Sequence, residues 1–141
     1  MIDKYAPIVP FCGIGGIRLG SAKDEVKAIC EKELGIPTML NDGKWSRYRI
    51  DDLLILLFEE QNGTLIKITA LPEYRGKLFD TVGTDFPLRR LMELDPSFVF
   101  DEFDEICYSD EKGVVIDAAT LDGPVGWISV YAKEPAADGA G

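Results

Sequence analysis

The chain has 141 residues, of which 46% are hydrophobic, so it is long enough to bury one core and too short for two independent domains. Fifteen basic and twenty-five acidic residues give a formal net charge of −10, which repels phosphate backbones and anionic lipid surfaces. The composition therefore disfavours binding to nucleic acid or to membranes, and it fits a basic partner better.

The first half of the chain predicts a short strand, a helix and three further strands, in that order. Residues 17–19 alternate in polarity as a strand does. Ser21 is a suitable N-cap, and apolar residues at spacings of three and four predict a helix over residues 22–34. Strands are expected over residues 45–50, 53–59 and 64–71, with the Asn62-Gly63 pair favouring a tight hairpin turn before the last of them.

The second half predicts the same order of elements. Gly83-Thr84 stands 63 positions after Gly20-Ser21 and is expected to supply the turn and the cap of a second helix over residues 87–94. A short strand over residues 78–82 precedes this helix. Four strands follow it, over residues 98–103, 105–109, 114–118 and 125–132. The repetition predicts a duplicated unit of helix and strands.

We therefore expect a single α+β domain over residues 1–133, built from two similar halves that each contribute a helix and antiparallel strands. The halves span about residues 8–71 and 78–132, and residues 72–77 link them. The helices are expected to pack on a mostly antiparallel sheet. Residues 134–141 are rich in Ala, Gly and Pro, which predicts a flexible C-terminal tail.

Sequence features relevant to location predict a cytoplasmic protein. No apolar run is long enough to cross a bilayer, and the N-terminus lacks the basic region, hydrophobic stretch and cleavage site of a secretion signal. Cys12, Cys30 and Cys107 are odd in number and widely separated, which is not typical of a disulfide framework or a metal-ligand pair. The three thiols are therefore expected to be reduced and mostly buried.

The sequence offers no catalytic motif. Histidine is absent, which removes the usual general base of serine and cysteine nucleophiles and the commonest transition-metal ligand. The glycines of residues 13–16 match neither phosphate-binding pattern, because Arg18 replaces the third glycine of one and the Gly-Lys-Ser/Thr ending of the other is missing. We expect no catalytic residues, no cofactor and no metal.

The densest charge cluster lies in the second half, and the first half has no acidic equivalent of similar density. Two aromatic residues interleave with its carboxylates and add apolar contact area beside acceptors for Arg and Lys. A solvated strand connection is the simpler interpretation, and a surface for a protein partner is the specific role that fits best. The candidate partner-binding residues are Asp101, Glu102, Phe103, Asp104, Glu105, Tyr108, Asp110 and Glu111.

The stretch GIRLGS at residues 16–21, followed by Glu25-Val26 and a strand meander, resembles the opening of several small bacterial helix-plus-sheet proteins. The broadest resemblance, over about residues 17–130, is to immunity proteins of polymorphic and contact-dependent toxin systems. Outer-membrane assembly lipoproteins and β-lactamase inhibitor proteins share a related unit. The resemblance implies a non-catalytic inhibitor that binds a cognate toxin domain, often a nuclease, inside the producing cell. The acidic charge agrees, because it favours encounter with a basic toxin.

Two other functions stay open. A carboxylate- or metal-dependent hydrolase could use the same acidic cluster, provided that at least two of its side chains converge in a pocket. A structural adaptor or homo-oligomer could pair through an exposed sheet edge. An immunity-type inhibitor is expected to be a monomer or a weak homodimer.

Overall fold

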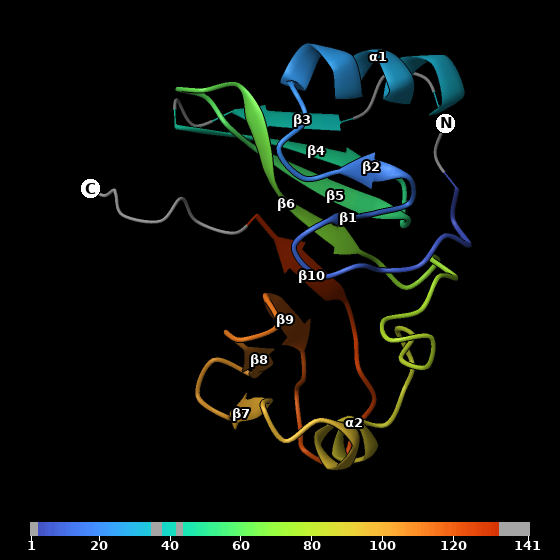
Figure 1. Ribbon diagram of the computed structural model, residues 1–141, viewed down its shortest axis with the longest axis vertical. Helices are drawn as coiled ribbons and strands as arrows, with labels where there is room; N and C mark the ends of the chain where they lie inside the picture. Colours follow the sequence, from blue (N-terminus) through green and yellow to red (C-terminus); the bar gives the residue numbers. More distant parts are fainter. Residues whose placement is uncertain (1–2, 35–37, 42–43, 133–141) are drawn as a thin grey trace.

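Ten strands and two short helices form the described part of the computed structural model, which comprises residues 3–34, 38–41 and 44–132 (Figure 1). Side chains are described for residues 3–29 and 44–132. The helices are α1 (Lys23–Leu34) and α2 (Leu88–Leu94). The strands are β1 (Gly13–Ile14), β2 (Ile17–Arg18), β3 (Thr38–Asn41), β4 (Trp45–Ile50), β5 (Leu54–Glu59), β6 (Thr64–Ala70), β7 (Val99–Asp101), β8 (Ile106–Ser109), β9 (Val114–Asp117) and β10 (Ile128–Tyr131).

Two four-stranded meanders, placed edge to edge, make one antiparallel sheet. Its strand order is β3-β4-β5-β6-β10-β9-β8-β7, and β1 and β2 form a separate hairpin. The meanders meet where β6 pairs with β10, so the last strand of each half lies at the centre of the sheet. The order therefore runs forward through one half and backward through the other, as two related units joined by a two-fold axis would place it.

The predicted α+β class is wrong, because the protein is mostly β and its helices form no layer on the sheet. α1 has 12 residues and α2 only 7. Among the described side chains of these helices, those fully buried in the core are Val26, Leu88 and Leu91. The apolar periodicity of the two segments correctly indicates helices, but helices of about three and two turns bury too few side chains to cover a sheet of eight strands.

The core lies between one face of the sheet and segments without long regular structure. Leu54, Leu56 and Phe58 alternate along β5 and are fully buried, while the residues between them are half-buried on the opposite face. The β1–β2 hairpin lies over the core face (Figure 1). The covering segments contribute Ile8, Ile14, Ile17, Tyr74, Leu78 and Val82 to the core.

The predicted linker at residues 72–77 packs against the N-terminal segment. Tyr74 is 2% exposed, and its hydroxyl donates to the carbonyls of Ala6 at 2.5 Å and Asp3 at 3.2 Å. Burial raises the pKa of Tyr74 to about 12, so the hydroxyl remains a donor at neutral pH. Tyr74 therefore anchors the segment that links the two halves to the N-terminal segment.

Most local elements lie close to their predicted positions, with four exceptions. β1 and β3 are not predicted, the strand expected over residues 78–82 is only a bridge between Leu78 and Val82, and α2 begins after Pro87 without a side-chain cap. Thr84, the predicted cap, instead donates its hydroxyl to the carbonyl of Pro72 at 3.2 Å. The predicted tail at residues 134–141 lies outside the described residues.

The structure also bears on the predictions for the cysteines and for membrane-spanning segments. Cys107 is buried as expected, whereas Cys12 is exposed, and both are free thiols. The side chain of Cys30 lies outside the described part. Over the ranges that the structure describes, neither helix combines the length and the apolar character that a membrane span requires.

Candidate functional site

The predicted acidic cluster is divided between the two ends of β8. Residues 101–105 make the turn from β7 into β8, and Asp110 and Glu111 lie in the turn that leads to β9. The four residues of β8 separate the turns by about 13 Å. Tyr108 is half-buried within β8, between Val99 of β7 and Val115 of β9. Five of the eight candidate residues therefore lie together, and the other three do not join them.

Asp101 fixes the shape of the β7–β8 turn. Its Oδ1 accepts hydrogen bonds from the amides of Phe103 at 3.0 Å and Asp104 at 3.1 Å. An aspartate that accepts from the amide two residues ahead forms an Asx-turn, which is a typical way to reverse the chain. Glu105 then adopts a φ of 56°, and the chain enters β8 at Ile106, opposite Asp101.

Phe103 stands at the tip of this turn with 91% of its surface exposed. Glu102, Asp104 and Glu105 beside it are also exposed. An aromatic ring in water among carboxylates is complementary to a partner that offers an apolar pocket bordered by Arg or Lys. We call residues 101–105 the acidic turn.

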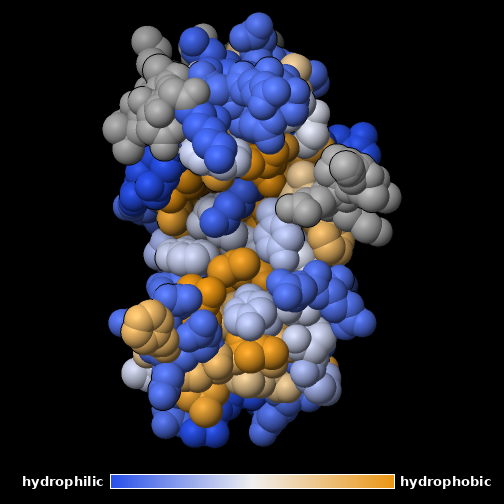
Figure 2. All heavy atoms as spheres, turned by 90° about the vertical axis from the view of Figure 1, so that its left-hand side faces the viewer, coloured by the Kyte–Doolittle hydropathy of each residue, from blue (hydrophilic) through white to orange (hydrophobic). Residues whose placement is uncertain are grey.

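Further apolar surface lies in the same half of the molecule. Figure 2 shows hydrophilic side chains over the upper end, whereas hydrophobic ones reach the surface near the middle and in the lower half. The lower half carries β7, β8, β9 and α2 (Figure 1). Leu94 at the end of α2 and Val99 on the edge strand β7 are among the large exposed hydrophobic residues there. The half of the molecule that carries the acidic turn thus also exposes apolar side chains.

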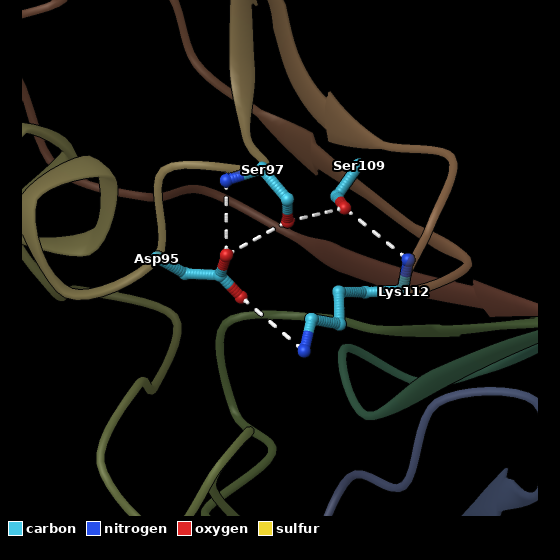
Figure 3. Close-up of polar contacts among 4 residues, drawn as sticks. All are labelled: Asp95, Ser97, Ser109 and Lys112. Carbon is cyan, nitrogen blue, oxygen red and sulfur yellow. Dashed lines mark hydrogen bonds and ion pairs between the residues drawn. The ribbon is translucent and has the colours of Figure 1, made fainter.

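A polar network joins α2 to the strands that carry the acidic turn (Figure 3). Asp95, the C-cap of α2, accepts from the amide of Ser97 at 3.0 Å and from its hydroxyl at 2.7 Å. The hydroxyls of Ser97 and Ser109 are 2.7 Å apart, and Ser109 accepts from the amide of Lys112 at 3.2 Å. The Lys112 ammonium lies 4.0 Å from the other Asp95 oxygen. The network thus connects the end of α2, the approach to β7 and the end of β8.

This network is structural, although it contains serine, lysine and aspartate. Partial burial alone raises the pKa of Asp95, but hydrogen bonds from Ser97 and the charge of Lys112 outweigh this effect and lower it below its ordinary value. Ser109 is 1% exposed, and its hydroxyl is already bonded to Ser97 and to a backbone amide. A substrate therefore has no access to it.

Carboxylates outside the acidic turn do not form a metal site within the described part of the chain, where no three His, Cys, Asp or Glu side chains gather as ligands. Burial raises the pKa of Asp117, and the negative charge of Glu105 raises it further. The Asp117 side chain lies against the backbone of Gly126, where an added Cβ would be 2.1 Å from Oδ2. Backbone thus occupies one side of this carboxylate.

A second candidate is a groove on the face of the sheet that points away from the core. It has a volume of about 330 Å³. The groove is lined by Arg47, Ile55, Leu57, Lys67, Thr69, Trp127 and Ser129, which come from β4, β5, β6, β10 and the residue before β10. The sequence does not indicate it, because only the register of four strands brings these residues together. The alternation of Arg47 and Arg49 with buried residues along β4 is the one local signal, and it is typical of any solvated strand.

Comparison of the chain with models of protein families, with curated proteins and with solved structures gives no significant match.

Proposed function

We propose that this protein is a non-catalytic inhibitor of the immunity type, which blocks a basic toxin domain by inserting the acidic turn into it. The observation that carries this proposal is the exposure of Phe103, 91%, at the tip of a turn whose backbone Asp101 holds in place. Aromatic side chains are enriched among the residues that contribute most to protein interfaces, and here exposed carboxylates flank the ring.

The residues of the turn have different roles in this proposal. Phe103 is the apolar anchor, and Glu102 and Asp104 supply charge that attracts Arg or Lys on the toxin. Asp101 holds the conformation of the turn and does not contact the toxin, since both amides that donate to it belong to the turn. Asp110 and Glu111, at the other end of β8, contribute only long-range attraction, which salt at physiological strength screens within about 8 Å.

The structural alternative has one observation in its favour. β7 is an edge strand of the large sheet, and Val99 on it is 50% exposed, so a second copy of the chain could pair there. β7 has only three residues, however, and offers few backbone hydrogen bonds to a partner strand. The hydrolase alternative requires carboxylates that converge in a pocket, whereas Glu102, Asp104 and Glu105 of the acidic turn are exposed to solvent and Asp101 is bonded to the turn's own amides.

Co-expression with the product of the neighbouring gene tests the proposal. The toxin-like neighbour is expected to arrest growth alone and to form a stable complex with this protein that restores growth. Phe103→Ala should weaken the complex by about tenfold or more, because a buried anchor contributes at least 1–2 kcal/mol. Asp104→Lys should slow association and make it less sensitive to salt.

Glu111→Lys is the matched control, since it makes the same charge change in the other turn of β8. The variant is expected to bind within about threefold of the wild type, as a screened distant charge does. Equal effects of Asp104→Lys and Glu111→Lys would show that the acidic turn is not the contact surface. A neighbouring gene product that neither binds this protein nor is neutralised by it would rule out the immunity function.

A further inference from the structure

Two cations on the open face of the sheet have no anionic partner among the residues that the structure describes. None of the ion pairs in the described part of the chain involves Arg47 or Lys67. Both residues pair across the sheet with Leu57, one from each side, so their backbones are about 10 Å apart. In a chain with ten more acidic than basic residues, two neighbouring unpaired cations require an explanation.

Lys67 occupies an environment that disfavours its charge. Burial lowers the pKa of its ammonium, and the nearby Arg47 guanidinium lowers it further. Both effects act against the charged form, and both would be offset by an anion placed between the two side chains. The folded protein thus maintains an electrostatic cost that a ligand can relieve.

The rest of the groove has the character of a ligand site. Ile55, Leu57 and Trp127 are half-buried and give it apolar walls. The hydroxyls of Thr69 and Ser129 lie among them, buried and hydrogen-bonded to each other at 2.7 Å. A volume of about 330 Å³ matches a molecule of modest size, because pockets for small ligands begin at roughly 300 Å³.

We propose that this groove binds a small organic anion, whose carboxylate lies between Arg47 and Lys67 and whose apolar body covers Leu57, Ile55 and Trp127. A guanidinium and an ammonium are the side chains that recognise carboxylates by charge-assisted hydrogen bonds. The tryptophan and the aliphatic side chains supply the apolar contact that a bare inorganic anion cannot use. The site does not depend on the proposed inhibitor function, since it lies where the two meanders join, and its strand nearest to the acidic turn, β10, is three strands from the edge strand β7.

Titration of the full chain with phenylbutyrate and with its neutral analogue phenylbutanol tests the proposal, with calorimetry as the readout. Phenylbutyrate is expected to bind about tenfold or more tightly than phenylbutanol, because each charge-assisted hydrogen bond contributes about 1.5–3 kcal/mol. Inorganic phosphate, which lacks an apolar body, is expected to compete only weakly. Equal affinities for the acid and the alcohol, or equal affinities for phosphate and the acid, would overturn the proposal.

Substitutions of the two cations test whether the carboxylate of the ligand binds between them. Lys67→Met keeps the length of the side chain and removes its charge, and it should weaken phenylbutyrate binding by about tenfold without changing phenylbutanol binding. Arg47→Gln tests the other cation from a different strand, should Lys67→Met fail to fold. Arg49→Gln is the control, because Arg49 also lies on β4 but already donates to the Asp51 carbonyl and the Asp52 carboxylate. An effect of Arg49→Gln equal to that of Arg47→Gln would overturn the assignment.

Proton uptake gives a readout that a purely structural role of Lys67 would not produce. A bound carboxylate favours the ammonium form, so binding measured just below the ordinary lysine pKa of 10.5 should take up protons from the buffer. Calorimetry in buffers of different ionisation enthalpy measures this uptake, which should be absent in Lys67→Met. Binding of phenylbutyrate to the wild type without proton uptake would place the carboxylate away from Lys67 and overturn the proposal.

Discussion

The hydroxyls of Thr69 and Ser129 lie 2.7 Å apart at the junction between the two halves of the sheet. The two residues pair directly across β6 and β10, and both are buried. A hydroxyl that loses its partner in such a place costs about 1–3 kcal/mol, whereas removal of both hydroxyls costs much less. The pair therefore contributes mainly to specifying how the halves join.

Single and double substitutions at this pair should not be additive. Thr69→Val leaves the fully buried Ser129 hydroxyl without its partner and should lower the free energy of unfolding by about 1–3 kcal/mol. Ser129→Ala should cost less, because Thr69 is 8% exposed and can reach water. The double variant Thr69→Val/Ser129→Ala should be more stable than Thr69→Val alone. Urea unfolding measures all three, and additive losses would contradict the hydrogen bond.

Asp95 should make the stability of the second half depend on pH. Its folded pKa lies below the unfolded value of 3.8, so the carboxylate stabilises the fold above that value, and the contribution is lost as the pH falls through the folded pKa. Asp95→Asn keeps an oxygen that can accept from Ser97 and removes the charge.

The difference in unfolding free energy between wild type and Asp95→Asn separates this carboxylate from all the others that titrate in the same range. It should be constant from about pH 7 to pH 5 and then shrink as the medium becomes more acidic. Urea unfolding at several pH values measures it. A difference that grows below pH 4 would mean that the pKa of Asp95 is raised, contrary to its contacts with Ser97 and Lys112.

Alanine substitutions at Gly113 and Gly63 would distinguish backbone strain from steric conflict. Both glycines have a positive φ, 70° at Gly113 and 62° at Gly63, so alanine is strained at either position. A Cβ at Gly113 would also lie 2.4 Å from the ring of Phe11, whereas at Gly63 it meets nothing within 4 Å.

Gly63→Ala should therefore cost about 1 kcal/mol through strain alone, and Gly113→Ala should cost at least 1 kcal/mol more. Thermal or urea unfolding compares the two variants. Phe11 also forms an edge contact with Tyr131, with ring centroids 6.2 Å apart, so its displacement should be visible in the aromatic NMR signals of both residues. Equal losses of stability would show that Phe11 moves aside without cost.

Much of the local structure is predictable from the sequence because its signals are local. β4 matches its predicted bounds, and the predicted strands over residues 53–59 and 64–71 lie within one residue of β5 and β6. The class is wrong for a reason that local patterns cannot reveal. The periodicity of residues 87–94 indicates a helix, but it does not show that irregular segments such as the one around Tyr74 cover the core instead.

The two candidate sites also differ in how far the sequence alone reveals them. Residues 101–105 are contiguous, so the sequence can propose them, and the predicted strand over residues 105–109 already separates them from Asp110 and Glu111, as β8 does. Arg47 and Lys67 are twenty positions apart and read individually as solvated charges. Their shared neighbour Leu57 appears only once the register of β4, β5 and β6 is known.

The conformation of the acidic turn should depend on Asp101 as a hydrogen-bond acceptor and not on its charge. Asp101→Ala removes both bonds to the amides of Phe103 and Asp104, so hydrogen exchange at these amides should accelerate by roughly threefold to tenfold. Asp101→Asn keeps an acceptor oxygen and should exchange nearly as the wild type does. Glu102→Gln is the control for the loss of one carboxylate beside the turn. Equal acceleration by Asp101→Asn and Asp101→Ala would show that the charge of the carboxylate is required. Unchanged exchange in Asp101→Ala would show that the Asx-turn does not hold the backbone, and Phe103 would then be presented by a mobile loop instead of a fixed one.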